Sequence, residues 1–385
     1  MFLICLFFLS FYPSGSYSLS AKPQGPKKYI RVAIVKDKKE INLKLRGSYR
    51  ISTLHTNELI KEGVNLKTTV RPTYSGLKLK DKDIKFFAIR IETRRDASII
   101  INKRKFRGII DIIREPDVTL LVVNHIDIEE YLCGVLYHEI SHLWPYEALK
   151  VQAVASRTFA LYQHKVNKDK DYDLTNTSFS QVYGGATSEK YRTNRAVIKT
   201  YGEILTYKSK IFPAYYHATC GGYTEDASRI WNIDIPPLKG VKCNFCKLSP
   251  YYRWRQKLPL SKIRQRLTEN GLKIGKIKSI EPTGYDESHR IINLKITHSS
   301  GETIISGYKF RIMMGTTLIR SANFNVKIDS NSAEFKGKGW GHGVGMCQWG
   351  VLFMALQGYD KEEILKFYYP ESKIENIWDE YDKSK

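Results

Sequence analysis

The stretch of sequence that decides the fold is "LYHEISHLWPYEALKVQAVASRTFALYQH", residues 136–164. It contains His138, Glu139 and His142 in the H-E-x-x-H spacing of zinc proteases. In that class of enzyme both histidines lie one turn apart on a single helix, so that their ring nitrogens converge on the metal. The function therefore depends on whether this stretch forms one helix or two.

Pro145 favours two helices, because a proline disfavours helical backbone at the residue before it, here Trp144. The sequence therefore predicts a turn at "SHLW" (141–144) and a second helix that starts at Pro145, a residue preorganised for the first helical position. The longer protease pattern also fails, since it requires a histidine where Ala148 stands. A zinc metalloprotease remains a remote alternative, in which His164 would have to serve as the third ligand.

The segments on either side of the helix pair predict an α+β fold. From Tyr29 to about Val123 the sequence consists of short β-branched segments separated by Gly, Asn, Asp and Lys, which is typical of strands. Beyond Lys168, loops and strands return, followed by the Gly-rich stretch "GKGWGHGVG" (337–345) and a last helical stretch, "DKEEILKFYYP" (360–370). We therefore expect a β-rich N-terminal part, a central helix pair, further strands, and a Gly-rich loop followed by C-terminal helices.

The N-terminus predicts export. Residues 2–12, "FLICLFFLSFY", are an uncharged apolar run of the length found in signal peptides and too short to span a bilayer. No Lys or Arg precedes the run, so an uncleaved membrane anchor remains open. The predicted organisation is a signal peptide at 1–21, a β-rich part at 22–118, a catalytic domain at 119–375 and a tail at 376–385. The expected location is the periplasm or the cell wall.

The charge of the protein predicts an anionic partner. The 385 residues contain 62 Lys and Arg against 39 Asp and Glu, which gives a net charge of +23. Nucleic acid, a membrane surface or an acidic glycan would each suit this excess, and a general bias toward lysine is the alternative. Export argues against nucleic acid, and we expect none as a partner.

Several longer stretches resemble a known family. They are "LLVVNHIDIEEYLCGVLYHEISHLWPYEALKVQAVASRTFALY" (120–162), "TSFSQVYGG" (177–185), "TYGEILTYKSKIFPAYYHATCGGYTEDASRIW" (200–231), "SPYYRW" (249–254), "SGYKFRIMMG" (306–315) and "KGKGWGHGVGMCQWGVLFMALQGYDKEEILKFYYP" (336–370). In this order they resemble the stage II sporulation protein D family of peptidoglycan lytic transglycosylases, which also includes amidase enhancers. The resemblance covers most of the chain after the signal segment.

The resemblance implies that Glu139 cleaves glycan strands between N-acetylmuramic acid and N-acetylglucosamine and leaves a 1,6-anhydro end. One carboxylic acid can suffice, because the C6 hydroxyl of the substrate acts as the nucleophile, unlike in the two-carboxylate scheme of other glycosidases. Glu139 must begin protonated, so we expect its pKa to be raised by an apolar setting and by the negative end of its helix. The alternative is a solvated residue at a helix end. No cofactor is expected to be required for catalysis.

The resemblance also implies a functional role for Arg157, a lone cation on an apolar helix. It would bind a muramic-acid carboxylate or stabilise developing charge, and a structural salt bridge is the alternative. The Gly-rich stretch lacks the sequence of a phosphate-binding loop, so its glycines are expected to let the backbone approach the glycan. The expected substrate-binding residues, each with an ordinary structural role as the alternative, are Gln181, Tyr183, Trp340, His342 and Gln348.

The cysteines predict a structural zinc site. His217 and Cys220 form one pair at x2 spacing, and Cys243 and Cys246 form a second, which is close to the spacing of zinc ribbons. A disulfide in an oxidising compartment, unpaired thiols, and a substrate-binding role for His217 remain open alternatives. Cys133 and Cys347 are expected to pack in the core.

Two function classes therefore compete, an enzyme and a wall-binding amidase enhancer that does not cut glycan itself. The expected partner of both is the peptidoglycan glycan strand, a polyanion when its stem peptides have been removed, and a cell-wall amidase is a further candidate partner. No membrane contact is expected unless the N-terminal segment stays uncleaved.

Overall fold

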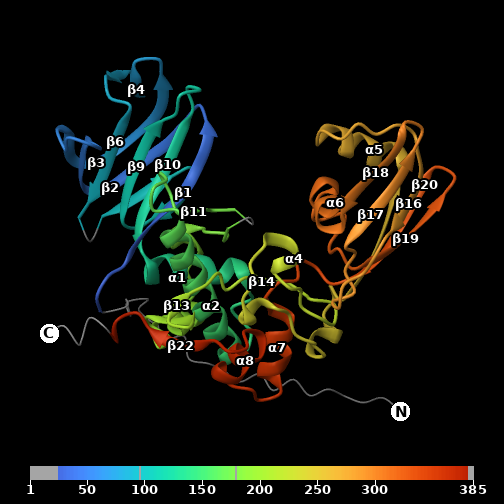
Figure 1. Ribbon diagram of the computed structural model, residues 1–385. Coiled ribbons are helices and arrows are strands. Elements are labelled where there is room, and N and C mark those ends of the chain that lie inside the picture. The colour runs from blue at the N-terminus through green and yellow to red at the C-terminus, as the bar shows by residue number, and fades with distance from the viewer. Residues whose placement is uncertain (1–24, 95–96, 178–179, 380–385) are drawn as a thin grey trace, which may run out of the picture.

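The structure is a computed structural model that describes residues 25–94, 97–177 and 180–379. The predicted signal peptide (1–21) and the last six residues of the predicted tail lie outside these ranges. Within them, no helix combines the length and the apolar character needed to cross a membrane. The mixture of helices and several sheets confirms the predicted α+β class (Figure 1).

The N-terminal part is an 11-stranded sheet with the strand order β11-β1-β10-β9-β6-β2-β3-β4-β5, to which β7 and β8 are added beside β2. Every second residue at the start of β2 is buried (Ile41, Leu43, Leu45), the period that a sheet with one covered face requires. The strands are β1 (Tyr29–Lys38), β2 (Ile41–Thr53), β3 (Leu59–Thr73), β4 (Gly76–Leu79), β5 (Lys82–Ile84), β6 (Ala88–Thr93), β7 (Ser98–Ile101), β8 (Arg104–Phe106), β9 (Ile109–Arg114), β10 (Leu120–Asp127) and β11 (Leu174–Thr175).

The helix pair continues directly from this sheet. Helix α1 (Ile128–Glu139) follows β10, and the Asp127 side chain caps it by accepting hydrogen bonds from the backbone N–H groups of the first turn. The helix ends at Glu139, because Ile140 is extended, and α2 (Tyr146–Val166) begins after Pro145. The predicted turn at 141–144 is confirmed, with the second helix starting one residue later than expected.

Residues 253–338 form a separate lobe with its own core, which the sequence did not predict (Figure 1). Its first and last strands pair with each other, so the chain leaves and re-enters the body at one place. Phe310, Phe324 and Phe335 lie at the centre of the core, with ring centroids 5.5–6.1 Å apart. The elements of this inserted domain are β15 (Arg253–Pro259), α5 (Leu260–Glu269), β16 (Ile277–Pro282), β17 (Asn293–His298), β18 (Gly301–Ser306), α6 (Gly307–Met314), β19 (Phe324–Asp329) and β20 (Ser332–Lys338).

The remaining elements pack around α2 and bring distant segments together. Strand β14 (Tyr216–His217) pairs in parallel with β21 (Met346–Cys347), so the "YYHATC" segment lies beside the Gly-rich loop. The C-terminal helices α7 (Gln348–Leu356) and α8 (Lys361–Tyr368) both contact α2. The other elements are η1 (Gly185–Ser188), α3 (Tyr191–Lys199), β12 (Glu203–Tyr207), β13 (Lys210–Ile211), α4 (Ser228–Trp231), η2 (Pro236–Leu238), η3 (Phe245–Leu248) and β22 (Lys373–Asn376).

Candidate active site

Glu139 lines a cavity of about 340 Å³ between the helix pair and the inserted domain. The carboxylate reaches the cavity because α1 ends at this residue, where the chain turns toward α2. The other walls come from β14, the end of α4, helix α6 of the inserted domain and the Gly-rich loop. Aromatic and polar side chains dominate the lining, which includes Tyr215, Tyr216, His217, Trp231, Tyr308, Arg311, Trp340, His342 and Gln348.

Burial raises the pKa of Glu139 to about 7. Three neighbours oppose this rise: the backbone N–H of Val182, which donates to Oε1 at 3.1 Å, and the side chains of Tyr216 and Gln348. The carboxyl is therefore part protonated near neutral pH, and the Val182 N–H fixes the position of its Oε1. These are the properties of a group that can first donate a proton and then accept one.

Tyr216 is positioned from behind by Gln181, whose side-chain amide donates to the tyrosine oxygen at 3.0 Å. Gln181 also accepts a hydrogen bond from the hydroxyl of Tyr131 and is fully buried. The prediction that Gln181 contacts substrate is therefore wrong: it lies one layer behind the cavity and holds a residue that lines it.

The Gly-rich loop supplies Trp340, His342 and, directly after β21, Gln348. Gln348 donates to the backbone carbonyl of Glu139 at 3.3 Å, which joins the loop to the end of α1. Both ring nitrogens of His342 are used inside the protein, one donating to the Tyr216 carbonyl and the other accepting from the Val344 N–H. His342 thus lines the cavity but presents its ring rather than the free nitrogen that a hydrogen bond to substrate would need.

Gly341 in this loop has to be a glycine. Its φ is +125°, in the region that favours glycine, and a Cβ there would lie 2.6 Å from the Cβ of His217. The absent side chain lets the loop pass directly over β14, whereas the sequence analysis expected the glycines to bring the backbone close to the glycan.

His217 lines the cavity and is almost fully buried. Its Nδ1 donates to the Val344 carbonyl at 3.1 Å, and its Nε2 has no hydrogen-bond partner in the described part of the chain. Burial, with a contribution from Arg290, lowers the pKa of His217 to about 3, so the ring is neutral and Nε2 is an acceptor. A buried acceptor beside a cavity is suited to a ligand hydroxyl.

Comparison with known proteins agrees with this arrangement. The sequence model of the stage II sporulation protein family matches residues 117–207, which include both helices of the pair. Stage II sporulation protein D of Bacillus subtilis is 33% identical over 270 residues, covering 66% of this chain and 75% of the relative. The chain belongs to the stage II sporulation protein D family. The resemblance inferred from the sequence is thereby confirmed.

Two other relatives extend the match. An uncharacterized protein of Brachyspira hyodysenteriae is 35% identical over 344 residues, 88% of this chain and 91% of that protein. The amidase enhancer of Bacillus subtilis is 29% identical over 287 residues, 62% of this chain and 39% of the enhancer. A model described as a domain of unknown function, DUF8618, matches residues 242–345, a range that encloses the inserted domain.

Two further predicted site residues do not reach the cavity. Arg157 is fully buried and forms a two-pronged ion pair with Glu129, with N–O distances of 2.8 and 2.6 Å. It therefore has the structural role that the sequence left as an alternative. Tyr183 is also buried, where its hydroxyl donates to Asn124 at 3.0 Å and its ring packs on Phe106.

The structure also separates the two histidines of the H-E-x-x-H pattern. His138 contacts the Ser188 hydroxyl through Nε2 at 2.6 Å, whereas His142 lies beyond the helix end in the turn. Tyr137 lies against both rings, with centroids 5.6 Å from each. Neither histidine belongs to the one group of metal-type ligands found among the described residues.

The predicted zinc ligands need one correction. Cys220, Cys243 and Cys246 do lie together, but the fourth member of the cluster is Cys347 and not His217. Strands β14 and β21 pair His217 with Cys347, but the Cys347 thiol lies in the cysteine cluster whereas His217 lines the cavity.

The sequence analysis missed residues that the inserted domain contributes to the cavity. Arg311 on α6 is the one Lys or Arg among the described residues of the lining, and burial lowers its pKa to about 10. Tyr308 on the same helix and Trp231 at the end of α4 lie beside it. All three lie inside the stretches that resemble the family, but nothing in their spacing indicated a shared site.

Proposed function

We propose that the protein is a peptidoglycan lytic transglycosylase in which Glu139 acts first as a general acid and then as a general base. The observation that supports this most is a carboxyl whose pKa is raised to about 7 in a cavity lined by aromatic rings. Such a group carries a proton at the pH where it must donate one.

In the proposed reaction, Glu139 protonates the glycosidic oxygen between N-acetylmuramic acid and N-acetylglucosamine as the bond to C1 breaks. The C6 hydroxyl of the same muramic acid then bonds to C1, and its proton passes to the Glu139 carboxylate. One bond breaks, one bond forms, no water is consumed and the acid is restored. Because the nucleophile belongs to the substrate, a second catalytic carboxylate is not needed.

The lining offers contacts suited to such a sugar. Arg311 supplies the positive charge for a lactyl carboxylate, the role that the sequence had assigned to Arg157. Trp340 is half-buried and offers a ring for stacking on a sugar, supported by the Arg320 guanidinium at 4.8 Å from its centroid. His217 presents part of its ring to the same cavity.

A second, larger groove supports an extended anionic polymer as the partner. It has a volume of about 710 Å³, lies on the inserted domain, and is lined by Arg253, Arg255, Lys336, Lys338, Trp254 and Tyr285. Glycan strands without stem peptides carry one carboxylate on each muramic acid, so we propose them as the substrate. The protein would meet this substrate after export, which the apolar run at residues 2–12 supports.

The second candidate is an amidase enhancer that binds glycan without cutting it, with a cell-wall amidase as its partner. The similarity to the amidase enhancer of Bacillus subtilis favours it. The enhancer hypothesis and the enzyme hypothesis make different predictions. Stimulation of an amidase by the enhancer would not depend on the proton of Glu139.

The two candidates are separated by incubating the protein with intact and with peptide-stripped peptidoglycan and analysing the products by mass spectrometry. We expect 1,6-anhydro-muramic ends from the wild type and a loss of at least about a hundredfold in their rate of formation with Glu139→Gln, the usual effect of removing a general acid. Glu130→Gln is the matched control, because Glu130 lies in the first turn of the same helix, outside the cavity.

Anhydro products that persist in Glu139→Gln would overturn the catalytic role. Their absence with wild-type protein on both substrates would overturn the enzyme proposal and leave the enhancer.

A further inference from the structure

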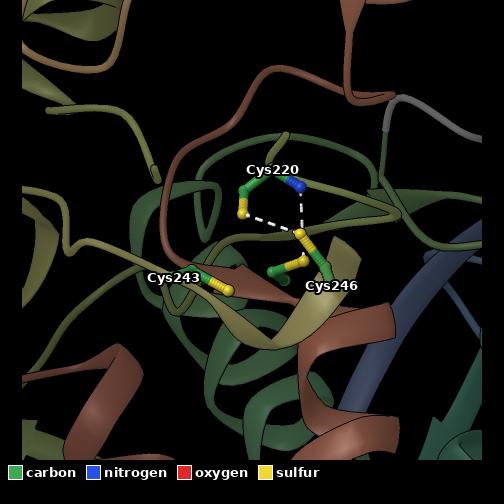
Figure 2. Close-up of side chains that lie close together, drawn as sticks. Cys220, Cys243 and Cys246 are labelled. Atoms are coloured by element: carbon green, nitrogen blue, oxygen red, sulfur yellow. Dashed lines mark hydrogen bonds between the residues drawn. The ribbon is translucent and has the colours of Figure 1, made fainter. Parts of the chain in front are cut away.

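Four buried cysteines meet behind the cavity wall. Cys220, Cys243, Cys246 and Cys347 are all fully buried, and their sulfur atoms lie within 4.8 Å of one another. The sulfurs of Cys220 and Cys246 are 3.3 Å apart. Figure 2 shows the side chains of Cys243 and Cys246, from one segment, and of Cys220, from another, close together.

We propose that these four thiolates bind one zinc ion as a closed structural site. In tetrahedral zinc with Zn–S bonds of about 2.3 Å, the sulfurs are about 3.8 Å apart. That value lies between the 3.3 Å that separates the sulfurs of Cys220 and Cys246 and the 4.8 Å limit of the cluster. Four sulfur ligands in this geometry select zinc or iron over the hard cations that prefer oxygen.

The segments that carry the ligands are typical of a structural metal site. Cys243 and Cys246 form a C-x2-C pair at the start of η3, whereas Cys220 lies three residues after β14 and Cys347 is the last residue of β21. A closed tetrahedral site usually takes its ligands as two pairs, each from one short segment. Here the first pair follows that pattern, but the second pair, Cys220 and Cys347, comes from residues 127 apart in sequence.

The surroundings of the sulfurs suit a negatively charged metal–thiolate group. The backbone N–H of Cys220 donates to the Cys347 sulfur at 3.2 Å, and that of Gly222 donates to the Cys220 sulfur at 3.4 Å. The Tyr368 hydroxyl lies 3.2 Å from the Cys243 sulfur, where it can donate. Donors of this kind around metal-bound sulfur orient the ligands and stabilise their charge.

A buried cation adds to this stabilisation. Arg290 of the inserted domain donates to the Cys220 carbonyl at 2.8 Å and to the Tyr223 carbonyl at 3.0 Å. Its Nε also lies 4.0 Å from a carboxylate oxygen of Glu225, so the cation is shared between that carboxylate and the segment that carries Cys220. The metal would therefore also strengthen the junction between the inserted domain and the body.

The site would fix the cavity wall without taking part in the chemistry. Cys347 directly precedes Gln348, which donates to the Glu139 carbonyl, and Cys220 closely follows Tyr216 and His217. With four protein ligands, no position on the metal is open to substrate. The ion would thus hold the pairing of β14 with β21 on which the cavity depends.

The test is metal analysis of the full chain after export and purification without chelator. Elemental analysis should find about one zinc per chain, and titration with a mercurial should release that zinc as four thiols react. Cys347→Ser should lower the zinc content and the unfolding temperature. Cys133→Ser is the matched control, because Cys133 is a buried cysteine outside the cluster and should leave the zinc content unchanged.

The zinc content of the wild-type protein tests the proposal even if Cys347→Ser does not fold. Wild-type protein with far less than one zinc and with a disulfide among the four cysteines would overturn it, as would iron with visible absorption in place of zinc. Failure of the proposed glycan reaction is a separate outcome, since metal content is measured without substrate and Glu139→Gln should keep its zinc.

Discussion

At the scale of single residues, Glu139 shows how burial rather than sequence neighbourhood determines chemistry. The sequence analysis expected an apolar setting and the negative end of the helix to raise its pKa, and in the structure the main cause is burial. The Val182 N–H limits the rise but also fixes the carboxyl in the cavity. The flanking histidines, which suggested a zinc protease, play no part in this environment.

The raised pKa predicts a pH-dependent cost to stability. The folded-state pKa is about 7 against 4.5 for an unperturbed glutamate, so between these values the folded chain binds more protons than the unfolded chain. The free energy of unfolding should therefore fall as the pH rises through this window. Glu139→Gln removes the cost and should be more stable than wild type at pH 8, by about 1–3 kcal/mol, with little difference at pH 4.

Urea denaturation of both proteins at the two pH values measures this difference. Burial also raises the pKa of Glu225 to about 7, so only the difference between variant and wild type is informative. Glu130→Gln, measured in parallel, is the control for the loss of one negative charge from the same helix. An equal difference at pH 4 and pH 8 would contradict the assignment.

At the scale of secondary-structure elements, local signals were readable from the sequence and long-range pairing was not. Pro145 acts on its own neighbours, so the start of the second helix was predicted to within a residue. The parallel pairing of His217 with Cys347 joins two short strands that are far apart in the chain, and nothing local specifies its register. For this reason the sequence analysis named His217 as the fourth zinc ligand, whereas the structure has Cys347 in that place.

The inserted domain was missed for a related reason. Its first strand, β15, pairs with its last strand, β20, so its boundaries become visible only when the two ends are seen together. Arg311 consequently lay outside the predicted site, although it lines the cavity beside residues of the helix pair.

The ion pair between α1 and α2 gives a prediction about elements. Arg157 and Glu129 are both fully buried, and Arg157 also donates to the backbone carbonyl of Glu203 at 3.0 Å. Removing the cation in Arg157→Ala leaves a buried, unpaired carboxylate, which should lower the free energy of unfolding by about 3–5 kcal/mol.

The companion variant Glu129→Gln/Arg157→Met removes both charges and should recover a large part of that loss. Thermal or urea unfolding of the single and double variants decides the matter. An Arg157→Ala protein of wild-type stability that has lost glycan cleavage would instead restore Arg157 to the active site.

At the scale of the whole molecule, the net charge is +23. Some of the basic side chains lie where repulsion between them destabilises the fold. In the groove of the inserted domain, Arg253 lies directly opposite Lys338 across β15 and β20, and Arg255 lies opposite Lys336. Like charges facing each other across a sheet are destabilising. Glu334 contacts Arg255 and Lys336, but Arg253 and Lys338 have no ion-pair partner among the described residues. This arrangement is explained if an anionic polymer supplies the missing charge.

The last prediction follows from this pair. Arg253→Glu/Lys338→Glu should weaken the binding of peptide-stripped glycan by about tenfold at low ionic strength, with the difference shrinking as salt screens the charges. Lys61→Glu/Lys67→Glu makes the same change in net charge on exposed positions of β3, in the N-terminal sheet, and serves as the matched control. Binding is measured by sedimentation with stripped glycan across a salt series. If both double variants lose affinity equally, the net charge alone is responsible and the groove has no special role; if neither does, the polymer is not held by charge.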